Sequence, residues 1–282
     1  RLNPKFGEAW ATLGVVLDRL GQPDDALAAS RMATSLEPDN WRHHMRLAYV
    51  CWGEERLRAA RRSLALLPGF PLAHWLAATV HVARQAFEEA ERELAAGLAS
   101  IEAGASTNRF SSVALDWLSG LLRLRVGDTA GALAAFEREL ANEPRGQLYA
   151  RECCANVWYA IGALRLREGR MDEARHAFSE TLSRVSGHPL ALAALGGLMG
   201  VSTSAVPAES LARVSKADLA MASAVNAVVR GDAPAAVQVI EDALDQIPAG
   251  SGLWLLPLDP SLHVDGDPAW TRALARLCNR AA

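Results

Sequence analysis

The sequence lacks long apolar runs and the alternating pattern of β-strands. Half of its 282 residues are apolar, but most of these are Ala and Leu, and sustained runs of Val, Ile and Thr are missing. This composition favours helices over sheet. The longest apolar stretch, residues 191–201, falls well short of the ~20 residues that a membrane-spanning helix requires. We therefore predict an all-α chain without membrane insertion.

The chain also lacks an excess of positive charge and a dense set of cysteines. Its net charge of −3 argues against a nucleic-acid partner, since such proteins carry a basic stripe that neutralises phosphates. Four scattered cysteines, at positions 51, 153, 154 and 278, do not form the disulfide framework of a small secreted domain. We expect a reducing, cytoplasmic environment.

Recognisable catalytic and metal-binding patterns are missing as well. The sequence contains no Gly-rich phosphate loop, no G-x-S-x-G elbow and no H-E-x-x-H motif. His43 and His44 are adjacent, as are Cys153 and Cys154, and adjacent side chains point about 100° apart around a helix. We therefore predict packing roles for these residues, and a chain that is not an enzyme and binds no cofactor or metal.

What the sequence does have is internal repetition. Three similar phrases each end in a proline that stands twelve residues after an alanine: Ala26 and Pro38, Ala132 and Pro144, and Ala236 and Pro248. A second phrase upstream, AWATLGVVLDRLG at 9–21, returns as VWYAIGALRLREG at 157–169. Together the two phrases predict a two-helix unit that must stack on its neighbours to bury its apolar face.

These marks divide the chain into one array of about seven helix-turn-helix repeats. The predicted repeats are 7–40, 41–70, 71–106, 107–146, 147–188, a degenerate 189–216, and 217–250, followed by a capping loop and helix at 251–282. Longer first helices are expected at 108–126 and 146–168, and a short second helix at 207–214. Asp267 as N-cap before Pro268 predicts the start of the last helix.

The repeats resemble the tetratricopeptide repeat family. The residues that carry this resemblance are Trp10, Leu13, Gly14, Leu17, Gly21, Ala26, Ala33 and Pro38 in the first repeat, and Trp158, Ile161, Gly162, Gly169, Ala174 and Phe178 in the fifth. The resemblance implies a right-handed superhelical solenoid whose concave face is lined by first helices, and a role as a docking scaffold. The tail resembles the closing segment of bacterial regulatory proteins, and Arg1 to Pro4 resemble the end of a preceding repeat. We therefore expect a piece of a longer bacterial polypeptide.

In this family the groove-facing side chains follow the tryptophan slot by one, five and eight residues. The stripe so predicted contains Ala11, Val15, Asp18, Met45, Tyr49, Trp52, Trp75, Thr79, Val82, Trp117, Leu121, Leu124, Tyr159, Ala163 and Leu166. Its large apolar members are typical of binding anchors, and Asn156 is placed to contact an acidic rim. The alternative is that these side chains pack on one another as core.

The sequence supports one main functional hypothesis and leaves three alternatives open. The main hypothesis is a non-catalytic scaffold, or a regulatory and sensor segment, that binds a peptide or partner helix through Met45, Tyr49, Trp52, Trp75, Trp117, Leu121, Asn156 and Tyr159. A small-molecule or lipid receptor is the first alternative, if the groove curls into a pocket. An enzyme is the second, although no constellation of residues in the sequence predicts a reaction, and a self-associating structural array is the third.

Overall fold

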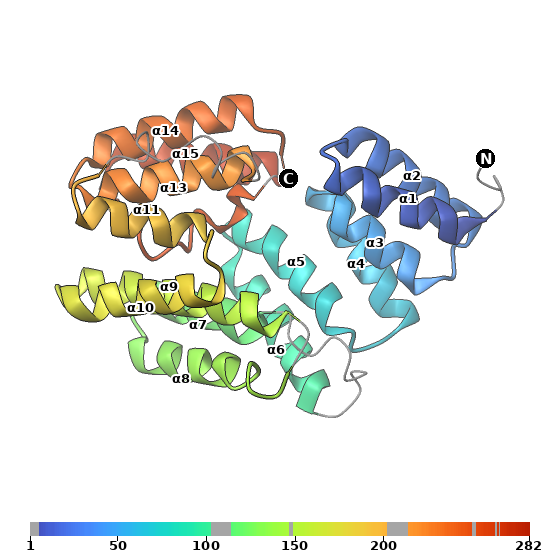
Figure 1. The fold of residues 1–282 in the computed structure, drawn as a ribbon. Helices are drawn as coiled ribbons and strands as arrows, with labels where there is room; N and C mark the ends of the chain where they lie inside the picture. Colours follow the sequence, from blue (N-terminus) through green and yellow to red (C-terminus); the bar gives the residue numbers. More distant parts are fainter. Residues whose placement is uncertain are drawn as a thin grey trace. The chain divides into compact units, whose positions relative to one another are not determined.

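The computed structural model describes residues 6–102, 114–146, 149–201, 214–249, 252–262, 264 and 266–282. Within these ranges all regular secondary structure is helical, which confirms the all-α prediction (Figure 1). The helices group into two compact units, residues 1–111 with 280–282 and residues 112–279. The predicted single array of seven repeats stays a prediction, and each unit is described separately below.

The first compact unit consists of helix pairs that follow one another directly. Its helices are α1 (Gly7–Arg19), α2 (Pro23–Leu36), α3 (Trp41–Val50), α4 (Gly53–Leu66), α5 (Pro71–Ala83) and α6 (Phe87–Glu102). Each odd-numbered helix packs on the even-numbered helix after it, and α3 also packs on α1 and α5. This is the predicted helix-turn-helix organisation.

The second compact unit continues the same pairing. It contains α7 (Leu115–Arg125), α8 (Thr129–Leu140), α9 (Ala150–Arg167), α10 (Met171–Arg184), α11 (Pro189–Leu198), α13 (Lys216–Val229), α14 (Ala233–Gln246), the short 3₁₀ turn η3 (Leu253–Leu255) and α15 (Pro268–Arg280). Helix α9 pairs with α10, and α11 packs on α13. The predicted helix at 207–214 lies almost wholly outside the described residues.

Small residues let the two helices of a pair approach closely, as the repeated phrases predict. A Cβ added to Gly162 of α9 would lie 2.6 Å from Cδ1 of Phe178 on α10, and one added to Gly120 of α7 would overlap the ring of Phe136 on α8. Phe178 and Phe136 are both fully buried. The missing glycine side chain therefore leaves room for an aromatic ring from the partner helix.

The expected start of α15 is correct, whereas both expected long first helices begin later than predicted, α9 at Ala150 after the left-handed Tyr149 and α7 at Leu115. Helix α9 is long, with 18 residues, and α15 begins at Pro268 with the Asp267 carboxylate accepting the Ala269 N–H at 2.7 Å. Helix α7 begins only at Leu115, because Ala114 adopts a left-handed conformation with φ of 58°. A left-handed residue interrupts the helix geometry, so no continuous helix spans 108–126.

Candidate functional site

The predicted stripe is partly exposed in the first compact unit. Met45 and Tyr49 lie four residues apart on α3 and so share one face of it. The Tyr49 side chain is 52% exposed, whereas Met45, Trp52 and Trp75 are half-buried and pack in part against the core around Leu57 and Leu76. Tyr49 is therefore the most accessible aromatic side chain of this stripe.

The structure corrects the predicted position of Trp52. Helix α3 ends at Val50, and Cys51 and Trp52 form the whole connection to α4. Gly53, with φ of 60°, starts α4 in a conformation that favours glycine. The prediction assumed a first helix of the usual length, and the shorter α3 moves Trp52 from the helix face to its end.

A buried guanidinium lies beneath this end of α3. Arg56, on α4, is 8% exposed, and its Nε donates to the Cys51 carbonyl at 2.9 Å. Its Nη2 donates to the Tyr49 carbonyl at 3.2 Å, and its Nη1 donates to Thr79 Oγ1 on α5 at 3.1 Å. The two carbonyls lie at the C-terminal end of α3, where cations are favourable. Arg56 thus holds the end of α3 in place.

The surroundings of Arg56 are mostly uncharged. Its guanidinium carbon lies 4.5 Å from the centre of the Trp52 ring, a cation–π contact. Burial lowers the pKa of Arg56 to about 10, and among the described residues no carboxylate forms an ion pair with it. Asp18 of α1 influences its charge from a longer distance, and burial raises the pKa of Asp18 while Arg56 lowers it.

In the second compact unit the same stripe is covered by the chain itself. Trp117, Leu121 and Tyr159 are no more than 5% exposed. The Trp254 ring meets the Trp117 ring edge-on, with centroids 6.4 Å apart. For these three stripe residues the groove prediction is corrected, because they are buried as the core alternative predicts, and residues of the segment 252–262 contact Trp117 and Tyr159.

The closing contact of this segment is a buried polar cluster. The Tyr159 hydroxyl lies 3.0 Å from Oδ1 of Asp259 and 2.9 Å from Oγ of Ser261, and the Ser261 N–H donates to Asp259 at 2.8 Å. Burial raises the pKa of Asp259 to about 6 and that of Tyr159 well above its usual range. The only sequence signal for this cluster was Asp259 within an apolar, Pro-rich tail. The sequence analysis interpreted that tail as a capping loop and did not predict the cluster.

Asn156 is half-buried and has an internal partner. Its Oδ1 lies 3.1 Å from Nε2 of His188, the N-cap of α11, whose Nδ1 accepts the Ala191 N–H at 3.3 Å. Because Nδ1 accepts, Nε2 carries the proton and donates to Asn156. Burial lowers the pKa of His188 to about 4, so the ring is neutral at pH 7. Asn156 therefore connects α9 to α11 in this structure.

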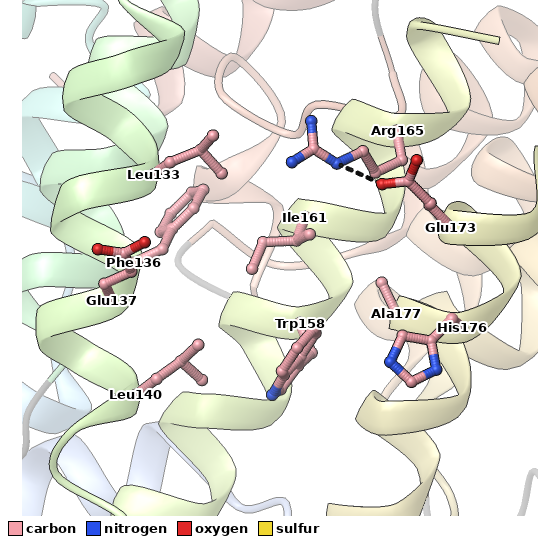
Figure 2. A pocket seen from close by; sticks show the side chains of 10 residues that line it. All are labelled: Leu133, Phe136, Glu137, Leu140, Trp158, Ile161, Arg165, Glu173, His176 and Ala177. Carbon is pink, nitrogen blue, oxygen red and sulfur yellow. Dashed lines mark ion pairs between the residues drawn. The ribbon is translucent and has the colours of Figure 1, made fainter. Parts of the chain in front are cut away.

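A separate pocket of about 330 Å³ opens between α8, α9 and α10 (Figure 2). It is lined by Leu133, Phe136, Glu137, Leu140, Trp158, Ile161, Arg165, Glu173, His176 and Ala177. Leucine, isoleucine and aromatic side chains form most of its wall, and Arg165 pairs with Glu173 at 3.5 Å. The pocket uses a different face of α9 from Tyr159, and the stripe pattern did not predict it.

The remaining chemistry-bearing side chains have packing or ion-pair roles. His43 is fully buried with Nε2 2.9 Å from a Glu37 oxygen, and His74 pairs with Glu93 at 2.7 Å. Cys153 and Cys154 are buried, which raises the pKa of both thiols. Across the described ranges, no three His, Cys, Asp or Glu side chains gather as a metal site. None of the described helices combines the length and apolarity needed to cross a bilayer.

Comparison with known proteins places this fold. The tetratricopeptide repeat family matches residues 11–66 and 118–189. The crystal structure of PilW, a widely conserved type IV pilus biogenesis factor, aligns at 16% identity over 89% of this chain and 97% of PilW, with a TM-score of 0.52. A tetratricopeptide repeat protein from Parabacteroides merdae aligns at 15% identity over 91% and 98% of the two chains, with a TM-score of 0.47. No curated protein matches the sequence.

Proposed function

We propose that this chain, which belongs to the tetratricopeptide repeat family over residues 11–66 and 118–189, is a non-catalytic protein that binds another polypeptide. The observation that carries the proposal is the accessible Tyr49 on α3, with Met45 one turn before it and Trp52 just beyond the helix end. Tyrosine and tryptophan are favoured anchors at interfaces. The first compact unit is therefore the proposed binding region.

The backbone at Tyr49 and the ring of Trp52 are held in position before any partner arrives. Arg56 binds the backbone carbonyl of Tyr49 and stacks on the ring of Trp52. Side chains that are already ordered lose less conformational entropy on binding. This arrangement supports a binding surface better than a loose set of exposed apolar residues would.

The proposal is tested by crosslinking and capture of partners from the native lysate. We expect a Met45→Ala, Tyr49→Ala variant to lose a partner that the wild-type chain captures, while circular dichroism shows that the variant stays folded. Met32→Ala is the control, because Met32 is also exposed but lies on α2. Identical capture by all three proteins would exclude the α3 surface as the binding region.

A second candidate, the binding of a small apolar molecule, rests on the pocket between α8, α9 and α10. Its volume of about 330 Å³ lies at the lower end of the range of small-molecule sites. We expect an apolar fluorescent dye to bind, and Leu133→Gln with Leu140→Gln to weaken that binding. Leu192→Gln, at an exposed position on α11, is the control. Equal dye binding by all variants would remove this candidate.

Three finer hypotheses stay predictions. They are the cytoplasmic location, the bacterial origin and the role as a regulatory or sensor segment of a longer polypeptide.

A further inference from the structure

We propose that the pocket between α8, α9 and α10 binds a small organic cation, an amine with an apolar body, whose ammonium group pairs with Glu137. This inference rests on the second candidate function above, the binding of a small apolar molecule, and deepens it by naming the charge of the ligand. The site combines the carboxylate of Glu137 on α8 with the apolar side chains of Trp158 and Ile161 on α9.

The first argument is the accessible apolar surface inside the pocket. Trp158 and Ile161 are three residues apart on α9 and so share one face of that helix, and both are half-buried. Leu133 and Leu140 line the pocket from α8 (Figure 2). Because removing apolar surface from water favours association, an apolar ligand body that covers these side chains is stabilised.

The second argument is the charge balance of the lining. The lining residues include two glutamates, Glu137 and Glu173, and one arginine, Arg165. Arg165 pairs with Glu168 at 2.8 Å and with Glu173 at 3.5 Å, and Glu173 also pairs with Arg170 at 2.6 Å. Among the described residues no cation forms an ion pair with Glu137. The pocket therefore presents one uncompensated negative charge.

Two further basic side chains lie at the pocket, and neither compensates Glu137. The guanidinium carbon of Arg184 lies 5.6 Å from the centre of the Trp158 ring, but Arg184 is already paired with two glutamates, at 2.8 Å each. His176 lies on α10, across the pocket from Glu137 (Figure 2). A positively charged ligand group is therefore the partner that Glu137 lacks.

The third argument is where the charge lies relative to the apolar surface. Glu137 is exposed, whereas Trp158 and Ile161 are half-buried. An ammonium group beside Glu137 would stay in contact with water, and so would not incur the full cost of removing a charge from water. Lysine side chains use the same arrangement, with a buried stem and a hydrated head. The ligand is therefore expected to carry its charge at one end.

The size of the pocket restricts the ligand further. Its volume of about 330 Å³ lies at the lower end of the range of small-molecule sites. A single ring or a short alkyl chain fits such a volume, whereas a helix of a partner protein does not. The proposed ligand is therefore a free amine and not a segment of another polypeptide.

The experiment compares three probes that share one body and differ in their head group: phenylbutylamine, phenylbutanol and phenylbutyrate. Binding to the full chain is followed by NMR through the indole N–H signal of Trp158, which is identified by its loss in Trp158→Phe. We expect the amine to bind roughly fivefold more tightly than the alcohol, since a partly exposed ion pair contributes up to about 1 kcal/mol. The carboxylate should bind most weakly. Equal affinities, or tightest binding of the carboxylate, would overturn the inference.

Two matched variants test the role of Glu137. Glu137→Gln keeps the shape of the side chain but removes its charge, so the affinities for amine and alcohol should become equal. Because Glu137 is exposed, the variant is expected to fold. Glu91→Gln, at an exposed position on α6, removes the same charge elsewhere and should leave the preference for the amine unchanged. A preference that persists in Glu137→Gln would contradict the inference.

The apolar dye separates failure of this inference from failure of the second candidate function. If no probe binds while binding of the dye still depends on Leu133 and Leu140, the inference fails and the pocket remains a candidate site for neutral molecules. If binding of the dye does not depend on these two leucines, the second candidate function fails and the inference fails with it.

Discussion

The hydroxyl of Tyr159 lies 3.0 Å from the carboxylate of Asp259, a residue 100 positions later in the chain. Both side chains are almost completely buried. This hydrogen bond joins the middle of α9 to the segment that covers the stripe of the second compact unit. It is one of the contacts by which this segment covers Trp117 and Tyr159.

Tyr159→Phe should destabilise the second compact unit. The change removes the hydroxyl that donates to the buried Asp259 carboxylate, and loss of one partner of a buried acceptor costs about 1–3 kcal/mol. Chemical denaturation compares the free energy of unfolding of the variant with that of the wild type. Tyr149→Phe, at an exposed tyrosine, is the control. Equal stability of the wild type and Tyr159→Phe would show that the hydrogen bond contributes little.

Asp259 should make stability depend on pH. Burial raises its pKa from 3.8 to about 6, so between these values the folded chain binds more protons than the unfolded chain. The contribution is therefore fully present below pH ~4 and is lost as pH rises through ~6, and the two-unit shift corresponds to about 3 kcal/mol. Unfolding free energies of the wild type and Asp259→Asn, measured from pH 4 to 8, should differ in slope. Parallel curves would contradict the prediction.

Glu139 is expected to act similarly at the start of α7. This buried carboxylate of α8 accepts the Trp117 N–H at 3.2 Å, and burial raises its pKa to about 7. Glu139→Gln keeps an acceptor but cannot ionise, so its stability relative to the wild type should rise as pH increases from 5 to 8. Glu137→Gln, an exposed position on the same helix, should show no such trend. The comparison requires thermal or chemical unfolding across that pH range.

Gly162→Ala should destabilise the α9–α10 pair. The new Cβ would lie 2.6 Å from the buried Phe178 ring, and overpacking of a filled core costs about 1–3 kcal/mol. At Gly187 an added Cβ meets nothing within 4 Å, so Gly187→Ala is the matched control with little expected effect. A folded Gly162→Ala variant as stable as the wild type would mean that the helices separate without cost.

The helices themselves were largely predictable, because their signals are local. Residues equivalent to Ala26, Gly162 and Phe178 return at matching positions in other repeats. Asp267 before Pro268 marks the start of α15. The errors arose where a short change in helix length mattered. Trp52 lies beyond the end of α3, and Ala114 stops α7 at its start. The spacing between repeats cannot detect such a shift, since it fixes the total length of a repeat and not where each helix begins or ends.

The candidate site was predictable only in part. Tyr49 is exposed as the stripe pattern indicates, but no repeat position points to Arg56, because its role depends on contacts with α3 and α5. A buried arginine looks like any surface arginine in a sequence.

The sequence alone determined the all-α class and the pairing of helices, since periodic small and apolar residues specify which neighbouring helices can pack. The tertiary structure decided which stripe residues are accessible. Trp117 and Tyr159 are covered by Trp254 and Asp259, and burial of this kind depends on residues far apart in the chain, which local periodicity does not encode.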